Sequence, residues 1–208
     1  MAGAVCSEQS RKYGLQLISA SEKGDAKTVE ALIETGAYIH TQNREGKCAI
    51  VAAAYNNSIE IADLLIAAGA DVNMKDNTLQ SAYLISTSEG YEELLRKTLK
   101  AGADVHCTDS YNGTGLIRAA DRGHVGIIRE LLKTGIRVNH VNRLGWTALH
   151  EAIILGDGGG RYAEVVRLLA GGGADVNLPD KDGVSPLTHA KSKNFTEIIK
   201  ILENAGAN

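Results

Sequence analysis

Apolar residues in this chain recur in two short helical stripes separated by a glycine. In the segment from Gly113 to Gly135, the first stripe ends before Gly123 and the second stops at Gly135. Apolar positions three and four residues apart are typical of an α-helix with one buried face. The stripes are formed by Leu116, Ala119 and Ala120, and then by Val125, Ile127, Ile128, Leu131 and Leu132. This pattern predicts a helix, a turn, a second helix and an exit that ends on glycine.

The pattern repeats six times along the chain. A pair of small residues follows each second stripe, and the glycines of these pairs lie 33, 33, 33, 38 and 33 residues apart. The pairs are Gly36-Ala37, Gly69-Ala70, Gly102-Ala103, Gly135-Ile136, Gly173-Ala174 and Gly206-Ala207. Such a fixed period indicates a stacked repeat array, in which no unit buries its apolar face alone.

Polar turns join the units. Clusters such as TQNREG, MKDNTL and PDKDG stand between them. Their Asn, Asp and Gly content is typical of chain reversals that project into solvent. The glycine after each second helix suits the left-handed backbone of a helix C-terminus, where a β-carbon costs about 1 kcal/mol.

A short motif marks the start of the first helix in several units. It is clearest as Thr147-Ala148-Leu149-His150-Glu151-Ala152 and is partly kept as Ser185-Pro186-Leu187. With this motif and period, the chain resembles the ankyrin-repeat family, whose signature is T-P-L-H-x-A. The resemblance implies an all-α ankyrin-repeat solenoid of stacked helix-turn-helix units with projecting β-turns and about twelve helices. We expect an N-terminal tail over residues 1–10 and a single ankyrin-repeat domain over residues 11–208, with repeats ending near 36, 69, 102, 135, 173 and 206.

Composition and charge narrow the class of partner. The chain has 22 Lys and Arg against 25 Asp and Glu, a net charge of −3, so it lacks the basic excess typical of nucleic-acid binding. Glu60 and Asp63 interrupt the long apolar run from Ile59 to Ala70, and no run reaches the roughly 20 residues of a membrane span. The first ten residues lack the basic start of a secretory signal, so we expect a cytoplasmic protein. A cleaved export signal would leave no trace, and export stays an alternative.

The histidines are expected to belong to the scaffold. In the signature motif, Thr147 caps free backbone N–H groups and His150 hydrogen-bonds within or between repeats, with no nucleophile indicated beside it. His40 and His106 hold equivalent positions two units apart, which places them about 20 Å from each other if neighbouring helices pack at 8–10 Å. Zinc ligands lie about 2.0–2.3 Å from one ion. We therefore predict no catalytic residue, no metal site and no cofactor.

The fifth repeat is longer than the others. Its period of 38 residues contains five additional residues, which alignment places at Asp157-Gly158-Gly159-Gly160-Arg161. Closure entropy grows only slowly with loop length, so such an insertion is easily tolerated. In the alternative interpretation it shapes a recognition edge, where its glycines let a partner's backbone approach closely.

The fifth repeat is also more apolar at exposed positions. Leu144, Trp146, Ile154 and Leu155 stand at turn tips and first-helix ends where the neighbouring repeats have mostly polar residues. The family resemblance implies that partners are contacted through these parts of the array, and an apolar cluster rimmed by charge is typical of a contact site. The expected partner-binding residues are Tyr111, Arg122, Arg143, Leu144, Trp146, Ile154, Leu155 and Arg161. In the alternative, Trp146 folds onto its own turn and Ile154 and Leu155 pack against the insertion.

We therefore predict a non-enzymatic, monomeric adaptor or scaffold that binds a protein or peptide on its concave face and turn tips. A preordered surface loses little conformational entropy on binding, so a few anchors suffice. Nucleic acid and membrane are not expected as partners. Two other classes stay open: a small-ligand or enzymatic site in the groove at the fifth repeat, and a regulatory subunit of a fixed complex.

Overall fold

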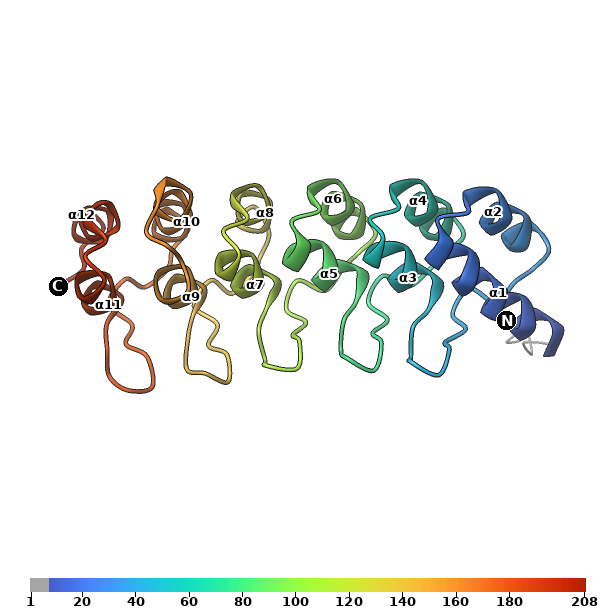
Figure 1. The fold of residues 1–208 in the computed structure, drawn as a ribbon, viewed down its shortest axis with the longest axis horizontal. Helices are drawn as coiled ribbons and strands as arrows, with labels where there is room; N and C mark the ends of the chain where they lie inside the picture. Colours follow the sequence, from blue (N-terminus) through green and yellow to red (C-terminus); the bar gives the residue numbers. More distant parts are fainter. Residues whose placement is uncertain (1–7) are drawn as a thin grey trace. The chain divides into compact units, whose positions relative to one another are not determined.

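The computed structural model describes residues 8–208, and their regular structure is helical apart from an isolated antiparallel bridge between Thr108 and Thr114. Twelve helices follow one another in six pairs (Figure 1). They are α1 (Glu8–Lys23), α2 (Ala26–Glu34), α3 (Ala49–Tyr55), α4 (Ile59–Ala67), α5 (Ala82–Glu89), α6 (Glu92–Lys100), α7 (Gly115–Asp121), α8 (Val125–Leu131), α9 (Ala148–Ile154), α10 (Gly160–Gly171), α11 (Pro186–Ser192) and α12 (Thr196–Asn204). The predicted all-α class is confirmed. Helix α1 begins inside the expected tail over residues 1–10, and the first seven residues lie outside the described part of the chain.

The chain divides into two compact units. Residues up to Ser86 together with Glu93–Asp104 form unit 1, and Thr87–Glu92 together with Val105–Asn208 form unit 2. In unit 1, α1 packs against α2 and α3, and α4 contacts α2 and α3. In unit 2, α9 lies between α7 and α11, and α10 contacts α8, α9 and α12. Within each unit the first helices of the repeats form one row and the second helices another, and the turns project from the row of first helices (Figure 1).

Helix α3 is buried on nearly every side. In α3, Ala49, Val51, Ala53 and Ala54 are fully buried, and Ile50 and Ala52 are 1% exposed. A helix that is apolar all round must lie inside a core, and small alanine side chains let neighbouring helices approach closely. Helices of seven residues are too short to be stable alone in water, so this packing holds them in place.

One side chain in each turn fixes its shape. The Asn142 Oδ1 atom accepts hydrogen bonds from the backbone N–H groups of Leu144 (2.9 Å) and Trp146 (3.1 Å), an arrangement that mimics a backbone turn. The same pair of bonds, to the second and fourth residues that follow, is made by Asn43, Asp76, Asp109 and Asp180. The predicted polar turns are thus built on one repeated Asx contact.

The signature motif acts as a capping box. The Thr147 hydroxyl accepts from the backbone N–H of His150 (3.4 Å), and the His150 Nδ1 atom accepts from the backbone N–H of Thr147 (3.3 Å). These reciprocal bonds satisfy donors that a helix N-terminus otherwise leaves free. His150 is 1% exposed, and burial lowers the pKa of its imidazole, which favours the neutral form. The predicted scaffold role of His150 within its own repeat is confirmed.

The exits of the repeats follow the glycine prediction, with one exception. The predicted left-handed backbone is found at Gly36, Gly69, Gly102, Gly173 and Gly206. Gly135 does not have a positive φ. Helix α8 ends four residues earlier, and the Thr134 hydroxyl donates to Leu131 O (2.6 Å) and accepts from the Ile136 N–H (3.3 Å). The Thr134 side chain therefore organises this exit.

Leu79 occupies a left-handed position in the third repeat. Its φ is 63°, and its side chain is 44% exposed. The equivalent turn positions hold Gly46, Asn112, Gly145 and Gly183. Since a β-carbon is strained there and little apolar surface would be lost, Leu79→Gly is expected to raise the free energy of unfolding by about 0.5–1 kcal/mol. Urea unfolding of this variant measures the change. The control is Gln80→Gly, which increases the entropy of the unfolded chain without relieving strain and should lower the free energy of unfolding; equal destabilisation by both substitutions would contradict the prediction.

Candidate protein-binding surface

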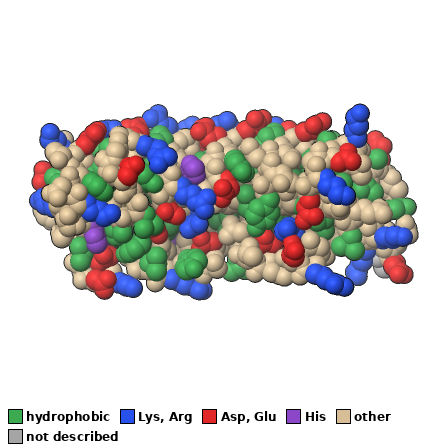
Figure 2. Space-filling view, viewed as in Figure 1, with side chains coloured by type: hydrophobic (Ala, Val, Ile, Leu, Met, Phe, Trp, Pro, Cys, Tyr) green, Lys and Arg blue, Asp and Glu red, His purple; other side chains and the backbone are tan. Residues whose placement is uncertain are grey.

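The eight predicted binding residues all lie in unit 2 and form what we call the fifth-repeat surface. Tyr111 is 61% exposed, Leu155 50% and Leu144 39%, which is high for large apolar side chains. Arg122, Arg143 and Arg161 are exposed, and Trp146 and Ile154 are half-buried. Figure 2 shows hydrophobic and basic side chains next to one another along the edge formed by the turns of unit 2. The predicted apolar residues thus differ in exposure: Leu144 and Leu155 are more exposed than Trp146.

Backbone contacts hold the turn tips together. The Arg143 N–H donates to Tyr111 O (2.9 Å), which joins the tips of the fourth and fifth repeats. A β-carbon added to Gly145 would lie 2.7 Å from Lys181 Cβ, so the tip of the sixth repeat is equally close on the other side. Leu144 is therefore presented on a turn that is fixed by its own Asn142 and by both neighbours.

The exposure of Leu155 follows from a substitution in a repeated contact. At the same position, directly after the first helix, other repeats carry a polar side chain that bonds to carbonyls at the end of the preceding first helix. In unit 1 Asn56 Nδ2 donates to Glu22 O (2.7 Å), and in unit 2 Arg122 donates to Ser88 O (3.1 Å) and Lys193 to Ile154 O (2.5 Å). Leucine cannot make this bond.

Tyr162 replaces the missing contact in the fifth repeat. Its hydroxyl donates to Asp121 O (2.9 Å), the carbonyl at the end of α7, and its side chain is 7% exposed. Leu155 is thereby released from a structural role, yet it keeps an exposed apolar side chain.

The insertion is anchored by internal packing. It lengthens α10 at its start, so that Gly160 and Arg161 are helical and α10 reaches 12 residues. Gly158 has a φ of 74°, and a β-carbon there would lie 2.3 Å from the Phe195 ring. The Phe195 ring of the same protein therefore packs directly against Gly158, at the place where a partner's backbone was considered. The Arg161 guanidinium lies 5.1 Å from the centroid of the Tyr162 ring, so it is held at the end of α7.

The structure groups the predicted residues into two clusters. Tyr111, Arg143 and Leu144 meet at the turn tips, and Leu155 and Arg161 are both close to the ends of first helices. Arg122 is engaged with the Glu89 carboxylate (2.7 Å). The eight predicted residues do not include Lys181 and Lys193, which hold the positions of Arg143 and Leu155 in the sixth repeat.

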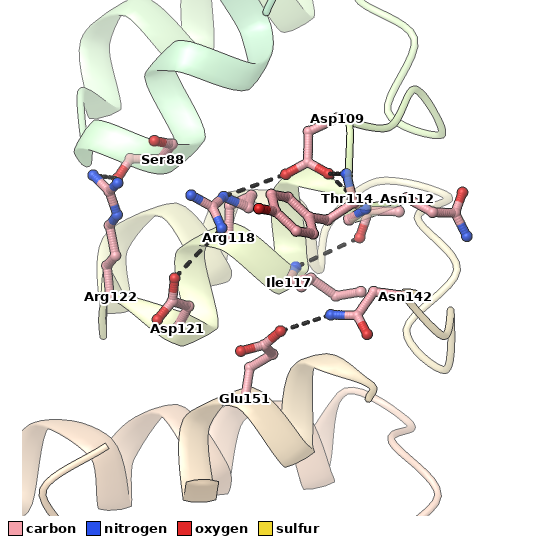
Figure 3. Close-up of polar contacts among 12 residues, drawn as sticks. Ser88, Asp109, Asn112, Thr114, Ile117, Arg118, Asp121, Arg122, Asn142 and Glu151 are labelled. Atoms are coloured by element: carbon pink, nitrogen blue, oxygen red, sulfur yellow. Dashed lines mark hydrogen bonds and ion pairs between the residues drawn. The ribbon is translucent and has the colours of Figure 1, made fainter. Parts of the chain in front are cut away.

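Below the surface lies a buried carboxyl group. Glu151 is 5% exposed and accepts a hydrogen bond from Asn142 Nδ2 (2.6 Å) (Figure 3). Burial raises the pKa of Glu151 to about 7; the Asp121 and Asp109 carboxylates also raise it, while the Asn142 bond and Arg118 oppose the rise. Glu151 is therefore protonated below neutral pH.

This carboxyl group reverses a pattern seen in the flanking repeats. There the Asp of the turn meets a basic side chain from the first helix: Asp109 pairs with Arg118 (3.5 Å), and Asp180 with His189 (2.8 Å). In the fifth repeat an amide, Asn142, meets an acid. Figure 3 shows Arg118 between Asp109 and Asp121, with Glu151 turned toward Asn142.

His40 and His140 also form contacts between repeats. His40 Nε2 accepts from the Asp71 N–H (3.2 Å), and His140 Nε2 bonds to Asn112 O (2.8 Å). In the part of the chain that the structure describes, no group of three or more His, Cys, Asp or Glu side chains could hold a metal ion. Over residues 8–208, no helix is both long and apolar enough to cross a membrane.

The period, the paired helices and the capping motif define a class of repeat protein. The model of the family "Ankyrin repeats (3 copies)" matches residues 12–76 and 79–180. The chain belongs to the ankyrin-repeat family. Ankyrin repeats are in general protein–protein interaction modules, and proteins of this family are generally non-enzymatic.

Solved structures and a curated relative agree with this assignment. The chain is 46% identical to an ankyrin repeat domain from Acinetobacter baumannii AYE, with a TM-score of 0.90, covering 93% of this chain and 98% of that one. It is 35% identical to the ankyrin repeat protein EF0377, with a TM-score of 0.87, over 92% and 97% of the two chains. The ankyrin repeat protein YahD of Escherichia coli K12 is 46% identical over 69 residues, which span 33% of this chain and 34% of that relative.

Proposed function

We propose that this chain is a non-enzymatic adaptor that binds a protein or peptide partner through the fifth-repeat surface. The observation that carries the proposal is Leu155, which is 50% exposed at a position where Asn56, Arg122 and Lys193 bond to a neighbouring repeat. Together with Leu144 it offers apolar area with a cationic rim, a composition typical of binding sites. The fixed turns and helix ends favour rigid presentation, which lowers the entropy lost on binding.

The remaining parts of this account are proposals of the same kind. We propose one continuous ankyrin-repeat domain over residues 11–208 that acts as a monomer, with no catalytic or cofactor role. Cytoplasmic residence stays a prediction from the sequence. Beneath the surface, Glu151 and Asn142 bond to each other, which favours a structural role for this pair over the enzymatic alternative.

Affinity capture from a lysate of the source organism tests this function. The Leu144→Glu, Leu155→Glu double variant is expected to retain at least tenfold less of a partner that the parent captures, since it places two charges into an apolar contact. The matched control is Leu15→Glu, Leu79→Glu, because these two leucines in unit 1 are similarly exposed, at 50% and 44%. Circular dichroism confirms folding of each variant. Equal capture by both double variants would refute the assignment of the surface.

A further inference from the structure

Each apolar anchor of the fifth-repeat surface is flanked by basic side chains. Near the start of α9, Tyr111 and Leu144 lie on the turn tips of the fourth and fifth repeats. Arg143 lies on the same tip as Leu144 and bonds to Tyr111 O, and Lys181 lies on the adjacent tip, close to Gly145. We call these four residues the tip cluster. At the other end, Leu155 lies between Arg161, held against the end of α7, and Lys193, whose ammonium bonds to Ile154 O; we call these three residues the helix-end cluster.

The basic side chains of the two clusters carry charge that unit 2 does not neutralise. Within residues 8–208, none of Arg143, Arg161, Lys181 and Lys193 forms an ion pair with a carboxylate. On the second helices, by contrast, Arg129 pairs with Glu164 (2.6 Å) and Arg167 with Glu197 (3.1 Å).

Few acidic residues accompany these cations. Asp157 and Asp182 are the exposed carboxylates in the adjoining insertion and turn, and four cations against two carboxylates leave 4 − 2 = +2. The chain as a whole carries −3. The positive charge is therefore a local property of this surface, where it complements an acidic partner.

The spacing of the clusters suits an extended chain. Helix α9 has seven residues, and a rise of 1.5 Å per residue makes it about 10 Å long. An extended peptide advances about 3.3 Å per residue, so roughly four to six residues span α9 and its two ends.

We propose that the fifth-repeat surface binds an extended acidic peptide segment with two apolar side chains about four to six residues apart. One apolar side chain contacts Leu144 and Tyr111, the other contacts Leu155, and Asp or Glu residues beside them face Arg143, Lys181, Arg161 and Lys193. This proposal rests on the proposed function and adds the chemistry of its partner.

Selection of random 12-residue peptides displayed on phage, with the whole chain as target, tests the proposal. The enriched peptides are expected to carry net negative charge and two apolar residues at the stated spacing. A fluorescein-labelled peptide of that sequence should bind about tenfold more weakly to Arg143→Glu, Lys181→Glu, because each reversal removes an attraction and adds a repulsion. The matched control, Lys133→Glu, Lys200→Glu, makes the same charge change on exposed residues beyond α8 and in α12 and should leave the affinity unchanged.

Other outcomes separate this inference from the proposed function. Enriched peptides that are basic or uncharged but lose binding to Leu144→Glu, Leu155→Glu would overturn the acidic partner and leave the surface assignment intact. Peptides that bind equally well to Leu144→Glu, Leu155→Glu and to Arg143→Glu, Lys181→Glu would overturn both the acidic partner and the assignment of the surface. Failure to enrich any peptide, or equal binding of a single-stranded dT12 oligonucleotide in place of the peptide, would overturn the linear acidic segment.

Discussion

Glu151→Gln is expected to stabilise the protein by about 2–3 kcal/mol at pH 8 and by little at pH 4.5. Glu151 has a pKa of about 7 in the folded chain against an ordinary value of 4.5. Between these two values the folded state holds a proton that the unfolded state has released, so stability falls as the pH rises from 4.5 to 7. Glutamine keeps the bond from Asn142 without a charge that must be buried near Asp121 and Asp109.

Urea unfolding of both proteins from pH 4.5 to 8 measures this effect. The difference between variant and parent should open as the pH rises from 4.5 to about 7 and then stay constant, because Glu151 is ionised in both states above its folded pKa. Glu203→Gln is the control, since the Glu203 side chain is 49% exposed and forms a surface ion pair with Lys191. A difference that does not change with pH would contradict the buried, protonated carboxyl group.

Gly158→Ala is expected to destabilise the protein by about 2–3 kcal/mol. The substitution combines the strain of a left-handed residue with displacement of the Phe195 ring, which lies 2.3 Å from the position of the new β-carbon. Thermal or urea unfolding measures the loss. A loss of this size would follow from the packing of the insertion, at Gly158, against Phe195 of the sixth repeat.

Gly160→Ala is the matched control for the insertion. A β-carbon there meets nothing within 4 Å, and the residue is the first of α10, so the change should be neutral or slightly stabilising. In a Phe195→Ala background, Gly158→Ala should cost less, because only the backbone strain remains. Equal destabilisation by Gly158→Ala with and without the ring would show that the insertion does not rest on Phe195.

The repeat architecture was predictable because its signals are local and recur. The glycine period and the apolar stripes fix the helices, and Thr147 and His150 form the cap that their spacing predicts. At Gly135 the Thr134 hydroxyl donates to Leu131 O and accepts from the Ile136 N–H, whereas Thr35, at the same position before Gly36, donates to Ala31 O and Gly36 keeps its positive φ. A contact specific to one repeat is invisible to reasoning that depends on the average repeat.

The binding surface was predictable only in part, for a related reason. Composition singled out the fifth repeat, and the exposed Leu144 and Leu155 agree with the expectation of accessible apolar residues. The exposure of Leu155 depends on a contact between repeats, the bond from Tyr162 to Asp121 O, which no single-repeat pattern contains. The same holds for Gly158, whose glycine signal was compatible with a partner until the Phe195 ring was found against it.

Hydrogen–deuterium exchange of the chain with and without its captured partner would locate the residues that the partner covers. Binding through the fifth-repeat surface should slow exchange in the turn around Leu144 and at the end of α9 around Leu155, with the backbone of α8 and α12 unchanged. Protection confined to the second helices, or to the turns of unit 1, would contradict the assignment of partner binding to the fifth-repeat surface.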